Sequence, residues 1–279
     1  KKWRKLRKLT QAQLSTGVCN QSEISRLESG EFFPSIEVLH LISNKLEVPL
    51  TYFIEVLIHG NIHEEKEAKE LINTLLLKKE YSEIYRITDD IIRQKAVIHP
   101  ELQKFLLWQY YVSAYNIGRI SHSYCVTELF NLLRTRTKGI DIFLDLHIKN
   151  SLANLLAEAH YHSKSIKLYK DILNEEISTD EVQKLKVKVL FNYGKLLKIQ
   201  KNHKDALSIT NRGIELSCKL SDMSLIGQLH YQKGIVMEEL NYEFQEVSKV
   251  FKKAYFIFEL LGLQLYVDII KEKKSEYLL

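Results

Sequence analysis

The segment from Thr10 to Gly30, TQAQLSTGVCNQSEISRLESG, combines two short helical patterns with a polar surface. In the second pattern Ile24 and Leu27 are three residues apart, so both fall on one helical face and should pack inward. The opposite face is polar and consists of Gln21, Ser22, Ser25 and Arg26. Arginine can donate two hydrogen bonds to O6 and N7 of guanine, and glutamine can bind the N6/N7 edge of adenine. The pattern therefore indicates a helix that reads base edges in a major groove, and the simpler alternative is the ordinary polar face of a soluble helix.

Two helix starts, ten residues apart, would hold this face in place. Thr10 can cap the first helix by accepting a hydrogen bond from the backbone of Gln13, whose side chain reaches back. Asn20 and Glu23 repeat this capping box at the second helix. Gln11 lies in the first turn of the first helix, where its amide and the helix dipole suit a phosphate group. We therefore expect contacts to double-stranded DNA from six residues: Gln11, Asn20, Gln21, Ser22, Ser25 and Arg26.

The charge of the chain is concentrated at its N-terminal end. Residues 1–30 contain seven Lys or Arg residues against two Glu residues, a net charge of +5 that equals the charge of the whole chain. A basic end on a neutral body is typical of a small nucleic-acid-binding domain, and the alternative is a solvated, frayed terminus. The chain begins without Met and inside a helical pattern, so we expect a few native residues before Lys1.

These N-terminal residues resemble the helix-turn-helix of phage-repressor (XRE-type) DNA-binding domains. The resemblance is carried by residues 10–14 and by QSEISRLESG, residues 21–30. It implies that the second helix is the recognition helix in the major groove. It also implies that Arg4 and Glu28 form a structural ion pair between the first and third helices. The segment between Leu14 and Ile24 is one residue shorter than the commonest form, which affects the register of the recognition helix.

Two further helices should complete this domain. They are predicted within PSIEVLHLISNKLEVPLTYFIEVL, residues 34–57, where Ser35 is a suitable cap and Pro49 separates the two. We therefore expect a five-helix domain over residues 1–58, followed by a helical linker over residues 59–79.

The composition favours helices throughout the chain. Only 3 Pro and 10 Gly occur in 279 residues, too few for the many turns of sandwiches and barrels, and a hydrophobic content of 45% can fill a core. No apolar run approaches the 18 residues that a membrane span requires, so no membrane partner is expected. The three cysteines are distant from one another, which indicates free, largely buried thiols in a reducing cytoplasm.

Small residues recur in the long C-terminal part with a period of about 40. They are spaced by 39, 41 and 40 residues and comprise Ala114, Ala153, Gly194 and Gly234. A bulky or helix-packing residue follows about 16 places after each: Phe130, Tyr169, Thr210 and Phe251. Small residues let two antiparallel helices approach closely, and the larger residue of the partner helix fills the gap. This pattern resembles degenerate tetratricopeptide (TPR) repeats, so residues 62–279 should form a right-handed superhelix of about five helix pairs.

The first helices of these pairs should build the concave face, where a row of carboxamides recurs. Asn150, Asn192, Gln228 and Tyr266 are spaced by 42, 36 and 38 residues, and Asn154 lies one turn after the first of them. A carboxamide offers a donor and an acceptor, so a row of them can hold an extended peptide by its backbone. The alternative is that these amides bond neighbouring loops, as in any helical protein.

The complete layout resembles the Gram-positive peptide-pheromone regulators that include the PlcR, NprR, Rap and PrgX groups, and PlcR-type activators above all. FLLWQYYVSAY, YCVTELFNLL, ANLLAEAHY and FNYGK carry this resemblance along the body. It implies a cytoplasmic quorum-sensing activator that binds a short signalling peptide on its concave face and a pseudo-palindromic DNA site as a homodimer. It further implies peptide contacts from Lys79, Asn150, Asn192, Gln228 and Tyr266. Ile54 and Leu77 stand where the family has Tyr and Lys, which implies a different signalling peptide.

Two other classes of protein fit this sequence less well. A TPR regulator that only binds proteins would lack the helix-turn-helix pattern. An enzyme is disfavoured because no P-loop, GxGxxG, HExxH or GxSxG motif occurs, so no catalytic residue and no cofactor is expected. His160 and His162 in AEAHYH are two residues apart and do not share a helical face, and His59 and His63 have no third ligand nearby in the sequence. No metal site is therefore expected.

Overall fold

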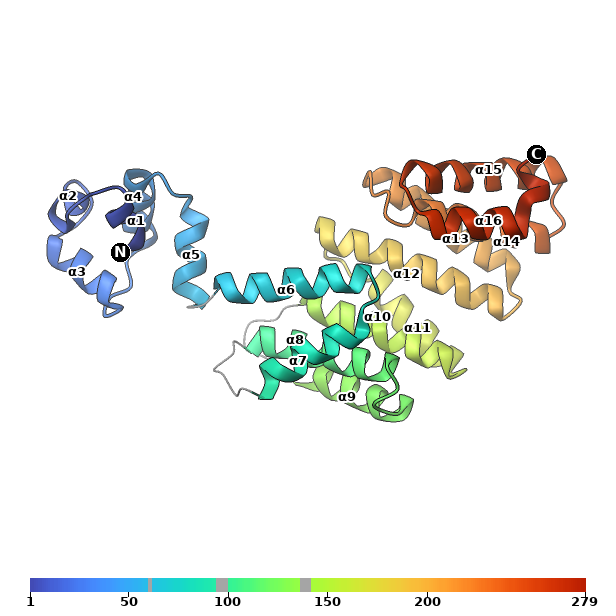
Figure 1. Cartoon of the computed structure of the whole chain (residues 1–279), viewed down its shortest axis with the longest axis horizontal. Coiled ribbons are helices and arrows are strands. Elements are labelled where there is room, and N and C mark those ends of the chain that lie inside the picture. The colour runs from blue at the N-terminus through green and yellow to red at the C-terminus, as the bar shows by residue number, and fades with distance from the viewer. Residues whose placement is uncertain (60–61, 94–99, 136–141) are drawn as a thin grey trace. The chain divides into compact units, whose positions relative to one another are not determined.

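The computed structural model describes residues 1–59, 62–93, 100–135 and 142–279, with the side chains of all of these except 55–59 and 62–66. Every regular element within these ranges is helical, which confirms the expected all-α class (Figure 1). No helix in the described ranges is both long enough and apolar enough to cross a membrane. Chain contacts divide the protein into two compact units, Lys1–Ile84 with Val97–Leu102 and Tyr85–Ala96 with Gln103–Leu279.

Five helices form the N-terminal domain, as expected. They are α1 (Lys2–Leu6), α2 (Gln11–Ser15), α3 (Gln21–Ser29), α4 (Ile36–Leu46) and α5 (Leu50–His59). Their core contains the inward face predicted for the second helical pattern, because Ile24 is only 1% exposed and packs with Leu14, Ile42, Leu46 and Val48. Burial of such apolar side chains is the main term that stabilises a small domain.

Local hydrogen bonds explain where the short helices begin and end. The Thr10 hydroxyl accepts from the backbone N–H of Gln13 at 3.1 Å, and the Gln13 side chain accepts from the Thr10 N–H at 2.8 Å. The Glu23 carboxylate accepts from the backbone N–H of Asn20 at 3.0 Å, before the first turn of α3. Gly30 ends α3 with a φ of +82°, a conformation that glycine adopts without strain. The two predicted helix starts are therefore confirmed.

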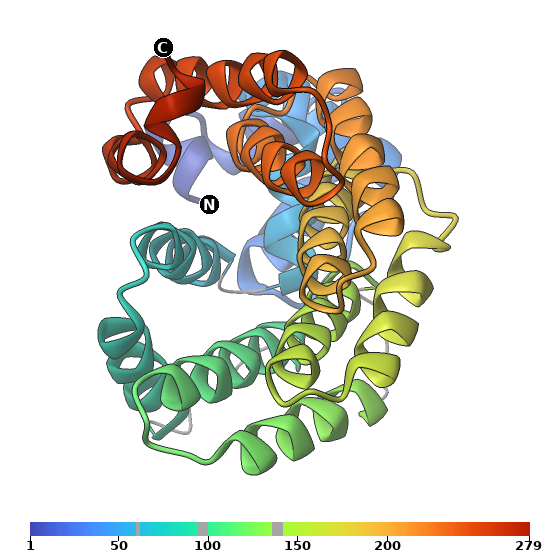
Figure 2. The same ribbon diagram turned by 90° about the vertical axis from the view of Figure 1, so that its right-hand side faces the viewer.

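The remaining helices follow one another as five successive pairs and a final helix. The pairs are α6 (Ile62–Leu77) and α7 (Tyr81–Arg93), α8 (Pro100–Asn116) and α9 (His122–Arg134), α10 (Ile142–Glu158) and α11 (His162–Leu173), α12 (Asp180–Ile199) and α13 (His203–Lys219), and α14 (Ile226–Glu239) and α15 (Phe244–Leu260). Then come α16 (Gln264–Lys274) and the 3₁₀ helix η1 (Ser275–Tyr277). Within the second unit α10 packs on α11, α12 on α13 and α14 on α15, and successive pairs stack on one another (Figure 2).

The period of small residues has the packing role that was predicted for it. A Cβ atom added at Gly234 would lie 2.7 Å from the ring of Phe251, and one added at Gly194 would lie 2.8 Å from the hydroxyl of Thr210. Ala153 and Tyr169 are likewise fully buried in one core cluster. These close approaches let the two helices of these three pairs come together without a gap.

The prediction that Phe130 fills the gap between two paired helices is wrong. Phe130 is 42% exposed, whereas Leu129 and Cys125 on the same helix are fully buried. A shift of one residue rotates a side chain by about 100° around a helix, which moves it from the core to the surface. All three cysteines are unpaired, as expected. Cys218, however, is exposed rather than buried.

A left-handed backbone residue ends the first helix of every pair. These residues have φ between 56° and 73° and are spaced by 39, 42, 41 and 40 residues: Lys79, Gly118, His160, Lys201 and Asn241. The N–H of the following residue donates each time to the carbonyl five residues earlier, at 2.8 to 3.1 Å. This is the Schellman bond of a helix C-terminus, and it gives all five pairs the same turn.

Candidate functional site

The polar face of α3 is available to a partner. Gln21, Ser22, Ser25 and Arg26 are all exposed, as is Asn20 at the start of the helix. The guanidinium of Arg26 lies over the ring of Phe32, with its central carbon 5.6 Å from the ring centroid. This cation–π contact holds the arginine near the surface without using its N–H donors. The structure thus brings together five of the six residues predicted to contact DNA.

The sixth residue, Gln11, has a partner that the sequence did not indicate. Its amide nitrogen donates to Oε2 of Glu28 at 3.0 Å, and the side chain is half-buried. The amide oxygen and the second N–H take no part in this bond. Gln11 therefore links α2 to α3, and its contact with a phosphate stays a prediction.

The ion pair implied by the XRE resemblance is present and fixes α1 against α3. Arg4 donates to both carboxylate oxygens of Glu28, at 2.7 and 2.9 Å. The side chains of Arg4 and Glu28 are only 12% and 6% exposed. The hydrogen bonds from Arg4, aided by the bond from Gln11, lower the pKa of Glu28 to about 2 against the cost of burial. Glu28 is thus ionised at neutral pH and serves as the scaffold that orients the polar face of α3.

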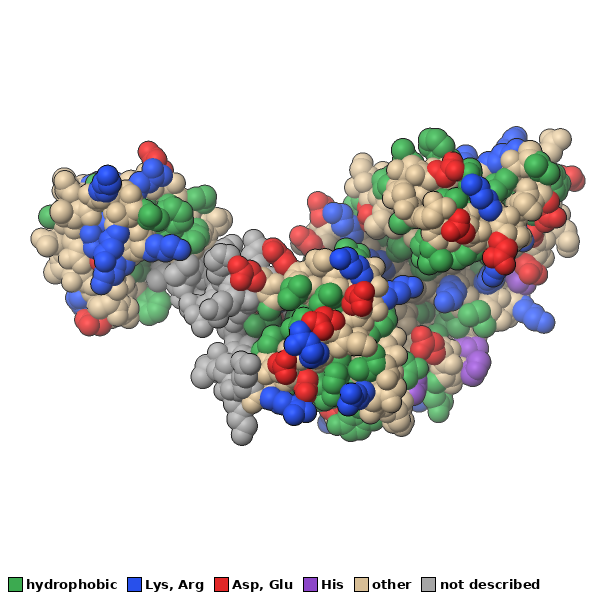
Figure 3. Space-filling view, in the orientation of Figure 1, with side chains coloured by type: hydrophobic (Ala, Val, Ile, Leu, Met, Phe, Trp, Pro, Cys, Tyr) green, Lys and Arg blue, Asp and Glu red, His purple; other side chains and the backbone are tan. Residues whose placement is uncertain are grey.

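Basic side chains surround this scaffold on the outside of the domain. Figure 3 shows Lys and Arg side chains gathered on the visible face of the N-terminal helices. Lys5 and Lys8 are both exposed, while Arg7 is held by an ion pair with Glu47 at 2.8 Å. Exposed lysines of this kind attract phosphates without distinguishing bases.

The carboxamide row lies on alternate helices of the second unit. Asn150 and Asn154 come from α10, Asn192 from α12, Gln228 from α14 and Tyr266 from α16, and all five are half-buried. Neighbouring helices bring two of them together, because the amide nitrogen of Asn192 lies 3.5 Å from the amide oxygen of Asn150. Tyr266 stacks on the buried ring of Phe258, with ring centroids 5.0 Å apart.

Part of this row has unused hydrogen-bonding capacity. The amide oxygen of Gln228 is buried and has no partner within the described residues. A buried carbonyl without a donor costs free energy, which a ligand N–H would recover.

A cavity of about 200 Å³ lies between α10, α11 and α12, beside two members of the row. Asn154 and Asn192 line it together with Glu158, Tyr169, Lys195 and three apolar side chains. The Tyr169 hydroxyl donates to the amide oxygen of Asn154 at 2.6 Å, which leaves the Asn154 amide N–H groups for a ligand. Asn192 uses an N–H toward Asn150, so its oxygen is available as an acceptor. The cavity therefore offers a donor and an acceptor, which is the pair that a peptide unit binds.

Three residues of this cavity were not predicted from the sequence. Tyr169 was expected only as packing, and burial raises the pKa of its hydroxyl to about 12, so it stays a donor at neutral pH. Glu158 accepts a hydrogen bond from the Tyr115 hydroxyl at 3.3 Å, a contact between different helices that its sequence neighbours do not indicate. The sequence did not indicate that Lys195, one residue after Gly194, lines a cavity, because this depends on the neighbouring helix.

Other predicted site residues are not among those that line this cavity. Lys79 is exposed in the left-handed turn after α6 and belongs to the first compact unit. The rings of His160 and His162 have centroids 5.6 Å apart, and the described residues contain no group of three possible metal ligands. The side chains of His59 and His63 lie outside the described residues.

Comparisons with known proteins cover both parts of the chain. The C-terminal domain of the RNPP family matches residues 68–279, and a helix-turn-helix family matches residues 1–53. The solved structure of Bacillus thuringiensis PlcR in complex with the peptide PapR7 and DNA is 39% identical, has a TM-score of 0.84, and covers 98% of this chain and 97% of that chain. The apo form of Bacillus thuringiensis PlcR is 36% identical, with a TM-score of 0.74 and 98% coverage of both chains. No protein with a curated description matches in sequence.

A more distant structure shows the same fold. ComR from S. thermophilus, in complex with DNA and its signalling peptide ComS, has a TM-score of 0.63 at 18% identity and covers 100% of this chain and 98% of that chain. At this identity the likeness concerns only the arrangement of the helices.

Proposed function

The chain belongs to the RNPP family, and from that premise we propose that it is a transcription regulator whose DNA binding is controlled by a short signalling peptide. One observation carries the proposal. The same chain has an exposed polar recognition face on α3 and a row of half-buried carboxamides on the alternate helices of its body. Its relatives PlcR and ComR have been solved with both DNA and a peptide bound.

The DNA-binding step uses the N-terminal domain. The Arg4–Glu28 pair holds α3 in place, Arg26 and Gln21 read base edges, and Lys5 and Lys8 attract phosphates. As in other helix-turn-helix regulators, two such domains in a homodimer would bind the half-sites of a pseudo-palindrome. The protein would act in the cytoplasm, where its DNA is.

The peptide-binding step uses the body. Asn154 donates to a peptide carbonyl and Asn192 accepts from a peptide N–H, while the free oxygen of Gln228 takes a second N–H farther along the row. A peptide that binds one curvature of the stacked helices more tightly shifts the population toward it. Activation requires that this curvature be the one that favours DNA binding, because a ligand with equal affinity for both would change nothing.

A selection from random palindromic duplexes, with and without short peptides encoded beside the gene, tests both steps together. Sequence-specific binding that tightens with one peptide is the expected result. Specific binding that no peptide changes would remove the peptide control, and the absence of any DNA binding would leave a protein-interaction regulator.

Two substitutions test how DNA is read. Arg26→Ala should cost about 1–3 kcal/mol at one base position and relax the preference there. Lys5→Gln should weaken binding to all sequences alike and reduce the salt slope by about 1. Unchanged specificity in Arg26→Ala would show that the recognition helix has another register.

A further inference from the structure

A cavity of about 380 Å³ in the body lies on another side of α12 than the carboxamide row. At 100° per residue, the α12 residues Gln183, Lys186 and Leu190 are turned from Asn192 by about 120–180°. The cavity also receives Leu173 from α11 and four residues from α13: Arg212, Glu215, Leu216 and Lys219. It therefore joins two successive helix pairs and has no part in the peptide site.

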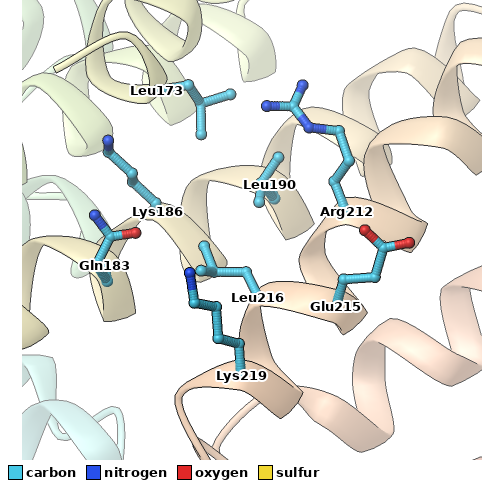
Figure 4. Close-up of a pocket in the computed structure, with 8 residues that line it drawn as sticks. All are labelled: Leu173, Gln183, Lys186, Leu190, Arg212, Glu215, Leu216 and Lys219. Atoms are coloured by element: carbon cyan, nitrogen blue, oxygen red, sulfur yellow. The ribbon is translucent and has the colours of Figure 1, made fainter. Parts of the chain in front are cut away.

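The side chains around this cavity combine an apolar floor with positive charge. Figure 4 shows the guanidinium of Arg212 and the ammonium groups of Lys186 and Lys219 arranged around the three leucine side chains. Leu190 is only 3% exposed and belongs to the core, while Leu173 and Leu216 are half-buried. Glu215 is the single acidic residue of the lining, which leaves a net charge of +2.

The three cationic side chains around this cavity keep N–H groups that could donate to a ligand. Within the described residues, no ion pair or hydrogen bond engages the exposed side chains of Arg212 and Lys219, although Glu215 is within one helical turn of both. Lys186 donates to the backbone carbonyl of Glu175 at 2.6 Å and keeps two further N–H groups. Arginine and lysine with free donors around one cavity form the donor set that carboxylates and phosphates bind.

We propose that this cavity binds a small organic anion that carries an apolar group, with a carboxylate or phosphate held by Arg212, Lys186 and Lys219 and the apolar group on Leu173, Leu190 and Leu216. Its volume is within the range of small-molecule sites, roughly 300–1,000 Å³. The leucine floor distinguishes this ligand from a simple inorganic ion, because only an apolar group gains from covering it.

Methyl-labelled leucine NMR of the full chain at low ionic strength tests the proposal. The probes are phenyl phosphate, 3-phenylpropanoate and inorganic phosphate alone. Saturable shifts of the Leu190 and Leu216 methyl groups, with a dissociation constant of about 1 mM or lower, are expected for at least one aromatic anion. The tighter of the two aromatic probes identifies the anionic group as phosphate or carboxylate.

Charge-removing variants separate a site from general attraction to a basic surface. Arg212→Gln and Lys219→Gln should each weaken the aromatic anion about tenfold, since each removes charge-assisted hydrogen bonds. Lys204→Gln removes an exposed charge from the same helix away from the cavity and should leave the affinity unchanged. Three results would overturn the proposal: no saturable shift up to about 10 mM, equal affinity for inorganic phosphate, or equal weakening by Lys204→Gln.

Discussion

Glu28→Gln tests whether one carboxylate holds the N-terminal helices together. Folding lowers the pKa of Glu28 from 4.5 to about 2, and this difference corresponds to about 3 kcal/mol of stability at pH 7. The substitution also leaves the largely buried Arg4 without its ionised partner, which costs free energy. We therefore expect Glu28→Gln to lower the free energy of unfolding of this domain by about 2–3 kcal/mol at pH 7.

The destabilisation caused by Glu28→Gln should become smaller as the pH falls. Because the folded pKa is lowered, the stabilisation is complete above pH 4.5 and is lost as the pH falls toward 2. Roughly 40% of it should remain at pH 3. The wild type and the variant should therefore converge as the solution becomes more acidic.

Fluorescence can follow this domain separately from the rest of the chain. Trp3 contacts Tyr52 in the domain core, with ring centroids 5.6 Å apart, and the chain has only 2 Trp. Urea denaturation in a Trp108→Phe background thus reports on Trp3 alone. Glu31→Gln, which removes an exposed charge two residues beyond α3, is the matched control. Equal stabilities of the two variants at pH 7, or a difference that stays constant down to pH 3, would refute the reasoning.

Three further predictions concern the body. Gly234→Ala should destabilise it by about 1–3 kcal/mol in urea denaturation, because the new Cβ would lie 2.7 Å from the Phe251 ring, and an unchanged midpoint would contradict this close approach. Lys201→Gly should stabilise it by about 0.5–1 kcal/mol, since glycine relieves the left-handed conformation at φ +61°, and a loss of stability in the same assay would show that no strain was present. Tyr169→Phe should weaken the peptide found by the DNA selection about tenfold by releasing Asn154, measured by fluorescence anisotropy, and should have no further effect in an Asn154→Ala background.

The sequence was sufficient for features that depend on neighbours along the chain. The capping pairs Thr10–Gln13 and Asn20–Glu23 lie within one helical turn, so their spacing alone predicted both helix starts. The period of small residues predicted the approach of Gly234 to Phe251, because each helix pair repeats one packing arrangement. The Arg4–Glu28 ion pair was predicted only from the family resemblance, because its residues are 24 positions apart in the sequence.

Features that depend on how helices cross were not predicted. The bond from Gln11 to Glu28 and the bond from Tyr169 to Asn154 join different helices, and neither residue type indicates its partner. Phe130 was predicted to fill the gap because it is a bulky residue 16 places after Ala114, but Leu129, one residue earlier, is the buried one. Periodicity gives the spacing of helices with an error of one residue, and on a helix that error decides between core and surface.

Because the same left-handed turn follows the first helix of each pair, the body consists of equivalent segments that a gene duplication could add. A segment from Asn202 to Asn241 begins directly after one such turn and ends on the next. A duplicated copy inserted after Asn241 would meet the same backbone conformation at both joins, so no new loop would be required. The copy would contain Gln228, and each duplication would therefore lengthen the carboxamide row by one residue. Under the proposed function, tandem duplication and deletion of such segments would match the body to longer or shorter signalling peptides.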